Sequence, residues 1–270
     1  MAPDISPHPL DSAVTRLLRS VAAEVVLPRF RNLAAHEVGE KSPGEWVTIA
    51  DHESEARLND GLARLLPEAR LVGEEACAMD AALIDQLGDG VVWLVDPIDG
   101  TQNFKEGITP FGLMVALLAD GEAQASWLYD PMADRLCHAA LGQGAFVDGV
   151  RIHARETGHI PPLASIAMGF LPPERRADIA MRAAGRLEIV PIPRCAAEQY
   201  PRLVLGQNDI ALFERILPWD HVPGALFVTE AGGVIARPDG SALRPTDHRP
   251  GLIGAASQRL WDVAAAALFA

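Results

Sequence analysis

The chain has 270 residues, of which 49% are hydrophobic, so it can bury a substantial core in one large domain or in two fused halves. Its 36 acidic residues outnumber the 23 lysines and arginines, which gives a formal net charge of −13. Because a polyanionic partner requires a basic surface, this balance argues against a nonspecific nucleic-acid binder.

Helical and turn patterns occupy the first part of the chain. Apolar residues recur at helical spacing over residues 10–26, and Pro28 marks the fraying end of this helix or a kink in it. Residues 42–45 have the composition of a turn between two short strands. A second helix is expected over residues 51–66.

The middle and the end of the chain have different patterns of predicted strands and helices. Between residues 111 and 152, apolar runs are separated by turn signals such as Asp120-Gly121 and Asp148-Gly149, which predicts an antiparallel sheet. After that, short strands are expected at 165–169, 187–190, 210–213, 233–236 and 252–255, alternating with helices at 173–184, 196–205, 222–230 and 257–269. We therefore expect an α+β fold of layered helices and sheets, with an N-terminal half over residues 1–149 and a C-terminal half over residues 150–270.

The three cysteines, Cys77, Cys137 and Cys195, are few, odd in number and without CxxC spacing, which fits a reducing cytoplasm. The first residues lack the basic and apolar regions of a signal peptide, and no apolar run approaches the ~20 residues that cross a bilayer. We therefore expect a cytoplasmic protein with no membrane contact.

Two carboxylates follow directly on an apolar run. Residues 91–95 are typical of a buried strand, and Asp96 and Asp99 come at its end. Like charges this close require a proton or a cation, and oxygen ligands suit a hard divalent cation such as Mg²⁺. Because Gly100 and Thr101 follow at the expected start of a helix, their amides could hold an anion beside the cation. The segment therefore indicates phosphoryl chemistry.

Asp-Pro and Asp-Gly are also ordinary turn dipeptides, so this segment alone could be only a sharp turn. Three further acidic segments support the metal site. Glu74 and Glu75 follow a short apolar strand, Asp51 lies at a strand-to-helix junction, and Asp220 precedes a predicted helix that ends at a glycine pair.

These segments together resemble the inositol monophosphatase family, within the lithium-sensitive, magnesium-dependent phosphatase superfamily. The matching motifs occur in the family's order: Lys41-Ser42-Pro43, GEE, WxxDPIDGTxNF and PWDxxxG…EAGG. The resemblance covers roughly Leu10 to the carboxyl end. It implies the layered αβαβα sandwich of the inositol monophosphatase and fructose-bisphosphatase type. It also implies hydrolysis of a small phosphorylated metabolite with two to three Mg²⁺ ions, inhibition by Li⁺, and a homodimer.

The resemblance assigns roles by position. Glu74 and Asp96 would hold the first Mg²⁺ with the carbonyl of Ile98, and Asp96 would bridge to a second ion. The remaining expected ligands of that second ion are Asp99 and Asp220. The implied catalytic residues are Asp51, Thr101 and Glu74, with Thr101 orienting the attacking water and donating a hydrogen bond to Asp51.

Alternatives stay open for several of these residues. Thr101 and Asp51 could serve as helix caps. Glu75 could bind metal directly or face solvent or the ligands, and Lys41 could neutralise phosphate or be a plain surface lysine.

The resemblance is weakest where the substrate would bind. Asp99 and Ala196 match substrate contacts of the family, but counting back from Asp220 places Phe213 where relatives carry a glutamate that binds hydroxyls. Glu214 is one residue late, and such a shift in a strand reverses the side-chain direction. Arg194 and Arg215 are additional charges that could bind a substrate carboxylate or second phosphate.

The two arginines could instead pair with Glu198 or Glu214. The sequence thus favours a phosphomonoesterase and leaves its substrate open among inositol 1-phosphate, histidinol phosphate, a sugar bisphosphate and a 3′-phosphonucleotide. A metal-binding scaffold without activity is the less favoured alternative, because the expected ligands are all present.

Overall fold

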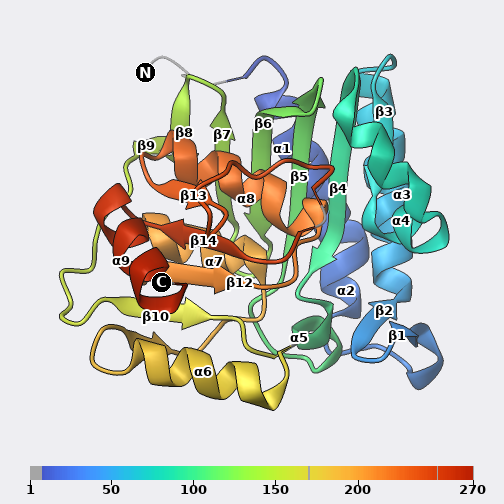
Figure 1. The fold of residues 1–270 in the computed structure, drawn as a ribbon. Helices are drawn as coiled ribbons and strands as arrows, with labels where there is room; N and C mark the ends of the chain where they lie inside the picture. Colours follow the sequence, from blue (N-terminus) through green and yellow to red (C-terminus); the bar gives the residue numbers. More distant parts are fainter. Residues whose placement is uncertain (1–7, 170, 248, 270) are drawn as a thin grey trace.

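The computed structural model describes residues 8–169, 171–247 and 249–269 (Figure 1). Two sheets lie at its centre, with one group of helices between them and one group on each outer face. Helices α1 (Asp11–Val21) and α3 (Ile49–Leu65) cover the first sheet from outside. Helices α7 (Ala196–Val204) and α8 (Pro218–Glu230) fill the space between the sheets, and α9 (Gln258–Leu268), with α6 (Pro173–Ala183) beside it, covers the second. The predicted αβαβα layering is confirmed.

The first sheet has seven strands in chain order and is antiparallel except for its first pair. Its strands are β3 (Arg70–Gly73), β4 (Val91–Asp99), β5 (Gly112–Ala119), β6 (Glu122–Asp130), β7 (Arg135–Ala140), β8 (Gly144–Val147) and β9 (Val150–Ile152). The hairpins predicted over residues 111–152 are therefore confirmed. Strand β9 pairs with β8, so this sheet continues to Ile152, and the division of the chain at residue 149 stays a prediction.

The second sheet has five strands in the order β11-β10-β12-β14-β13. Its strands are β10 (Leu163–Ile166), β11 (Glu188–Val190), β12 (Ile210–Phe213), β13 (Val234–Ala236) and β14 (Leu252–Ala255). Strands β10, β11 and β12 are parallel, so their carboxyl ends meet at one edge of the sheet. Short hairpin strands β1 (Val38–Ser42) and β2 (Glu45–Thr48) form a separate pair.

Local chemistry moves several element boundaries. The first helix contains a π-helical turn (Ala22–Val26) and continues past its predicted end into α2 (Leu27–Arg29). The wider turn accommodates Pro28, which has no N–H to donate. Helix α8 begins at Pro218 rather than at Val222, because proline is well suited to the first helical position. The apolar pattern does not predict helix α4 (Glu74–Met79) or the 3₁₀ turns at Ala35–Glu37 and Ala81–Gly88. For helix α5 (Thr101–Lys105), the sequence predicts only the start.

Apolar packing fixes these layers against one another. One buried cluster lies between α1, α3 and the first sheet, including Trp93 and Trp127, and another surrounds α7 and α8 between the two sheets. Within residues 8–169, 171–247 and 249–269, no helix combines the length and hydropathy that crossing a bilayer requires.

A buried carboxylate, Asp209, holds the loop that leads into β10. It accepts hydrogen bonds from the backbone N–H groups of Thr157 (2.8 Å) and Leu163 (2.9 Å) and from the Thr157 hydroxyl. We expect Asp209→Ala to lower the free energy of unfolding by about 3 kcal/mol, because it leaves buried donors without an acceptor. Urea denaturation measures this, with the exposed Asp60→Ala as control. Equal stability of the two variants would contradict the prediction.

Candidate active site

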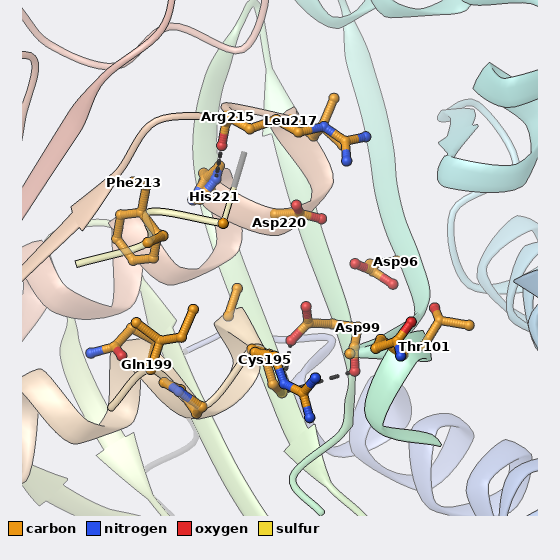
Figure 2. A pocket seen from close by; sticks show the side chains of 18 of the residues that line it. Asp96, Asp99, Thr101, Cys195, Gln199, Phe213, Arg215, Leu217, Asp220 and His221 are labelled. Carbon is orange, nitrogen blue, oxygen red and sulfur yellow. Dashed lines mark hydrogen bonds between the residues drawn. The ribbon is translucent and has the colours of Figure 1, made fainter. Parts of the chain in front are cut away.

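Carboxylates from three separate elements meet at the end of β4. Figure 2 shows three of the acids at this place, Asp96 and Asp99 from β4 and Asp220 from α8. One ligand oxygen from each of Glu74, Asp96 and Asp220 lies within 4.8 Å of the others. Glu74 begins α4, Asp96 lies in β4, and Asp220 lies in the first turn of α8, where the positive end of the helix favours a carboxylate. Because α8 packs across β4, β5 and β6, it brings Asp220 to the strand that carries Asp96.

A break in strand pairing brings Asp99 to the same place. The register of β4 against β5 shifts between Asp96 and Asp99, where Pro97 has no N–H for the ladder. Such a shift changes the direction of the side chains that follow it. Asp96 and Asp99 consequently line one cavity.

This group of acids is electrostatically strained. Asp96 is 1% exposed. Burial, followed by the charge of Glu74, raises the pKa of Asp96 well above its ordinary value, and burial, followed by the charge of Asp99, raises that of Asp220. Atom Oδ1 of Asp96 is buried and has no hydrogen-bond partner among the described residues. Oxygen-only ligands, excess negative charge and an unpartnered buried oxygen fit a hard divalent cation such as Mg²⁺.

The other two predicted acids hold different partners. Atom Oδ2 of Asp99 accepts a hydrogen bond from Ala197 N (2.7 Å) and one from Cys195 Sγ (2.9 Å) at the start of α7. Glu75 and Glu74 both contact Lys41, whose Nζ lies 2.8 Å from Glu75 Oε1 and 2.7 Å from Glu74 Oε1. Lys41 is therefore a partner of the acidic group rather than a free surface lysine.

Asp51 and Thr101 form a hydrogen-bonded pair beside the acids. The Thr101 hydroxyl lies 3.1 Å from Asp51 Oδ1 and 2.9 Å from the carbonyl oxygen of Ile98. Oxygen Oδ2 of Asp51 accepts from Thr48 N and the Thr48 hydroxyl at 2.7 and 2.6 Å, so Asp51 also caps α3. Burial raises the pKa of Asp51 to about 7. Capping and contact with Thr101 thus coexist.

These groups face one cavity of about 450 Å³. The β1–β2 hairpin lines one side, and residues at the carboxyl ends of β10, β11 and β12 line another. Gly100 and Thr101 also line the cavity. Gly100 has a φ of 83°, and a Cβ there would lie 3.2 Å from Cys195 Cβ and from the Pro110 carbonyl oxygen, so any other residue would be strained at this position.

Comparison with known proteins decides the family. The model described as the inositol monophosphatase family matches residues 6–270. The chain belongs to this family. An inositol-1-monophosphatase of Mycobacterium leprae is 32% identical, covering 98% of this chain and 95% of its own length. The Nus factor SuhB of Escherichia coli is 27% identical, covering 85% of each chain. The solved structure of the Thermotoga maritima IMPase is similar in fold, with a TM-score of 0.78, 24% identity and coverage of 96% and 97%.

Membership in this family identifies the chain as a phosphoric monoester hydrolase. The predicted resemblance and the enzyme class are therefore confirmed. The individual roles of the site residues stay predictions, because family membership by itself assigns none of them.

The substrate side of the cavity differs from the sequence-based expectation at β12. Phe213 lines the cavity but is 9% exposed, with its ring stacked on Tyr200 at a centroid distance of 5.2 Å. Strand β12 ends at Phe213, so the alternation of strand side chains does not carry over to the next residue. Glu214 also lines the cavity, and its Oε1 is buried with no hydrogen-bond partner among the described residues. The expectation that Glu214 faces away from the cavity is therefore wrong, whereas a role of Glu214 in binding substrate hydroxyls stays a prediction.

Both predicted arginines line the cavity and both have carboxylate partners. Arg194 Nη2 lies 3.3 Å from Glu106 Oε2, and Arg215 pairs with Glu45 of the β1–β2 hairpin. Glu198, one of the partners considered from the sequence, is instead bound by two other arginines, Arg135 and Arg202. Ala196 lines the cavity at the first turn of α7.

Sequence reasoning missed several polar residues at the site. Gln199 lines the cavity, accepts a hydrogen bond from the Ser165 hydroxyl (2.6 Å), and leaves its buried Nε2 without a described partner. Glu55 lies behind α4, four residues after Asp51. The available signal for Glu55 was this i, i+4 spacing on a helix, which places two acids on one face.

The stability of the metal-free protein should depend on pH through Asp96. The pKa of Asp96 in the folded protein lies above its value of about 4 in the unfolded chain. The contribution of Asp96 to the free energy of unfolding is therefore complete below about pH 4 and is lost as pH rises through the folded-state pKa. With EDTA at about pH 8, Asp96→Asn should therefore raise Tm by a few degrees, and the gain should shrink towards about pH 5. Differential scanning fluorimetry measures both. A variant less stable than the protein itself at pH 8, with Asp60→Asn unchanged, contradicts this prediction.

Proposed function

We propose that this protein is a Mg²⁺-dependent phosphomonoesterase that acts on a small phosphorylated metabolite. The observation that carries the proposal is the buried Asp96, whose Oδ1 has no partner among the described residues although Glu74 and Asp220 lie within ligand distance of it. A site of this charge is costly without a cation, and the family of the chain supports phosphoryl chemistry at it.

The residues that would hold Mg²⁺ are carboxylates and one carbonyl: Glu74, Asp96, Ile98, Asp99 and Asp220. When bound, the ions would supply charge neutralisation for the phosphate and the leaving oxygen. Gly100 and Thr101 would offer their backbone amides to the phosphate, in line with their place at the start of α5. The −13 net charge of the chain would then not oppose an anionic substrate locally.

Proton removal from the attacking water would run through Thr101 and Asp51. The Thr101 hydroxyl would accept a hydrogen bond from the water and donate its own proton to Asp51 Oδ1, which lies 3.1 Å away. Because the pKa of Asp51 is raised to about 7 by burial, its carboxylate is a suitable acceptor for that proton near neutral pH. Lys41, held between Glu74 and Glu75, would balance negative charge beside the phosphate.

The leaving group would lie against Ala196, Phe213 and the carboxyl ends of the parallel strands. Arg194 supports a substrate with a second anionic group, because its guanidinium lies at the cavity and is 47% exposed. A second candidate is an inositol-1-phosphate phosphatase proper. The unpartnered Oε1 of Glu214 favours it, since a carboxylate oxygen can accept hydrogen bonds from polyol hydroxyls.

Three finer properties belong to the same proposal. The intact acidic group supports Li⁺ sensitivity, the three unpaired cysteines support a cytoplasmic location, and the family resemblance supports a homodimer. A relative is named Nus factor SuhB, so a role apart from catalysis is the alternative to test alongside phosphatase activity.

Phosphate release by the unmodified protein separates an enzyme from a scaffold, and Asp96→Asn then tests the metal assignment. We expect the variant to lose at least ~10³-fold in kcat at saturating Mg²⁺, since it removes the central ligand. We expect Thr101→Ala to lose about 10²- to 10⁴-fold with a similar KM, because proton transfer is impaired while binding is kept. Phosphate release from a generic phosphomonoester measures both. Asp96→Asn with the turnover of the unmodified protein would falsify the metal assignment.

The substrate is tested by a panel of phosphorylated metabolites and two variants. If a second anionic group is recognised, Arg194→Ala should lower kcat/KM about 10- to 100-fold for the best anionic substrate and leave inositol 1-phosphate nearly unchanged. If Glu214 binds polyol hydroxyls, Glu214→Gln should instead lower kcat/KM for inositol 1-phosphate by a similar factor. We expect the first pattern, and inositol 1-phosphate as the best substrate of the unmodified protein would reject it.

A further inference from the structure

Glu55 is a buried carboxylate that accepts hydrogen bonds from the start of α4. It is 6% exposed, and each of its two oxygens accepts a backbone hydrogen bond. Oε2 accepts from Glu75 N at 2.8 Å, and Oε1 accepts from Ala76 N at 2.9 Å. Both donors follow directly on Glu74, the acid that α4 contributes to the carboxylate group.

The short helix α4 has no cap of its own. It spans only Glu74–Met79, and Gly73, at the position before it, offers no side chain to its first N–H groups. Glu55 supplies this function from another helix. Gly73 leaves the necessary room, since a Cβ there would lie 2.4 Å from the carboxyl carbon of Glu55. Gly73, the glycine of the GEE motif, is therefore needed for the side chain of Glu55 to reach the start of α4.

Helix α3 thereby fixes two parts of the site at once. Asp51 in its first turn contacts Thr101, and Glu55 one turn later holds the backbone beside Glu74. Side chains four residues apart lie on the same helical face, about 5–6 Å apart at their Cβ atoms. The distance between the Thr101 side of the site and the Glu74 side is consequently set by one rigid helix.

We propose that Glu55 is a positioning residue that sets the place of Glu74 and thereby the affinity of the site for divalent cations. This inference rests on the proposed function, in which Glu74 is a Mg²⁺ ligand. Glu55 is not among the residues that line the cavity, and it acts through the backbone N–H groups of the two residues that follow Glu74. Residues that orient metal ligands commonly change metal affinity about 10- to 100-fold when they are altered.

The test compares Glu55→Gln with Glu53→Gln. Glutamine keeps the size of Glu55 but turns one acceptor into an NH₂ group that faces a backbone N–H. Glu53 lies on the same helix, bears the same charge and pairs with Arg29 (2.7 Å) outside the cavity, so it is the matched control. Mg²⁺ binding is measured by isothermal titration calorimetry, and the Mg²⁺ dependence of phosphate release is measured in parallel.

We expect Glu55→Gln to weaken Mg²⁺ binding about 10- to 100-fold, with the half-saturating Mg²⁺ concentration for activity rising in parallel and kcat at saturating Mg²⁺ staying within a few-fold. The control should match the unmodified protein in all three. A lower Tm in EDTA with unchanged Mg²⁺ affinity would show a purely structural cap and overturn the proposal.

Two further outcomes are distinguishable. If the unmodified protein binds no Mg²⁺, the proposed function fails and the role of Glu55 fails with it; if the unmodified protein binds Mg²⁺ and Glu55→Gln binds it equally well, only the role of Glu55 fails. If Glu55→Gln does not fold, Glu55→Asp serves instead, because it keeps the charge and shortens the reach by one methylene. Weakened Mg²⁺ binding in Glu55→Asp supports the proposal, and Mg²⁺ binding equal to that of the unmodified protein overturns it.

Discussion

Repulsion among buried carboxylates is the constraint on which this structure depends. Asp96 and Asp220 come from different elements, yet their side chains share a confined, low-dielectric space that raises the pKa of both. Left to themselves, these groups would separate or take up protons. They stay together because each is attached to an element whose own packing is strongly favourable: a central strand with Trp93 and Leu94 fully buried, and a helix between two sheets.

Rigid elements convert that packing into geometry. Strand β4 carries two of the acids and changes register between them, α8 brings a third, and α3 holds the backbone next to the fourth. Hydrogen bonds to Asp99 from the start of α7 tie the same group to the second sheet. The acids thus lie at a place held by elements of both sheets, and a shift of either sheet would change the distances between the acids.

Motif chemistry was predictable from the sequence, whereas supporting contacts were not. Asp96, Asp99 and Asp220 could be found because strand ends, turn residues and helix starts are local signals. The contacts of Glu55 and Gln199 could not be predicted, because their partners lie 20 or more residues away in the chain and depend on how helices pack against strands. The layers were predictable from apolar periodicity together with the family resemblance, while the start of α8 moved because proline is favourable at a first helical position.

Glu214 shows a second limit of prediction from the sequence, which is the direction of a side chain at the end of a strand. Alternation of side chains is a property of a continuing strand, and β12 stops one residue earlier, so the residue after it is free to face the cavity. A prediction that depends on one residue of register is therefore only as good as the predicted strand end. The same holds for the loops after β10 and β11, which also line the substrate side of the cavity.

Under the proposed function, the leaving group would be recognised by residues outside the family motifs. Arg194 adopts a left-handed backbone conformation, with a φ of 55°, which costs a residue with a Cβ about 1 kcal/mol. Its pairing with Glu106 at 3.3 Å is half exposed to water and contributes little in return. The exposed guanidinium of Arg194 at the cavity supports the proposal of an anionic ligand there. A leaving group that presents an anion to Arg194 and a hydrogen-bond donor to Glu214 would satisfy the guanidinium and the unpartnered oxygen at once.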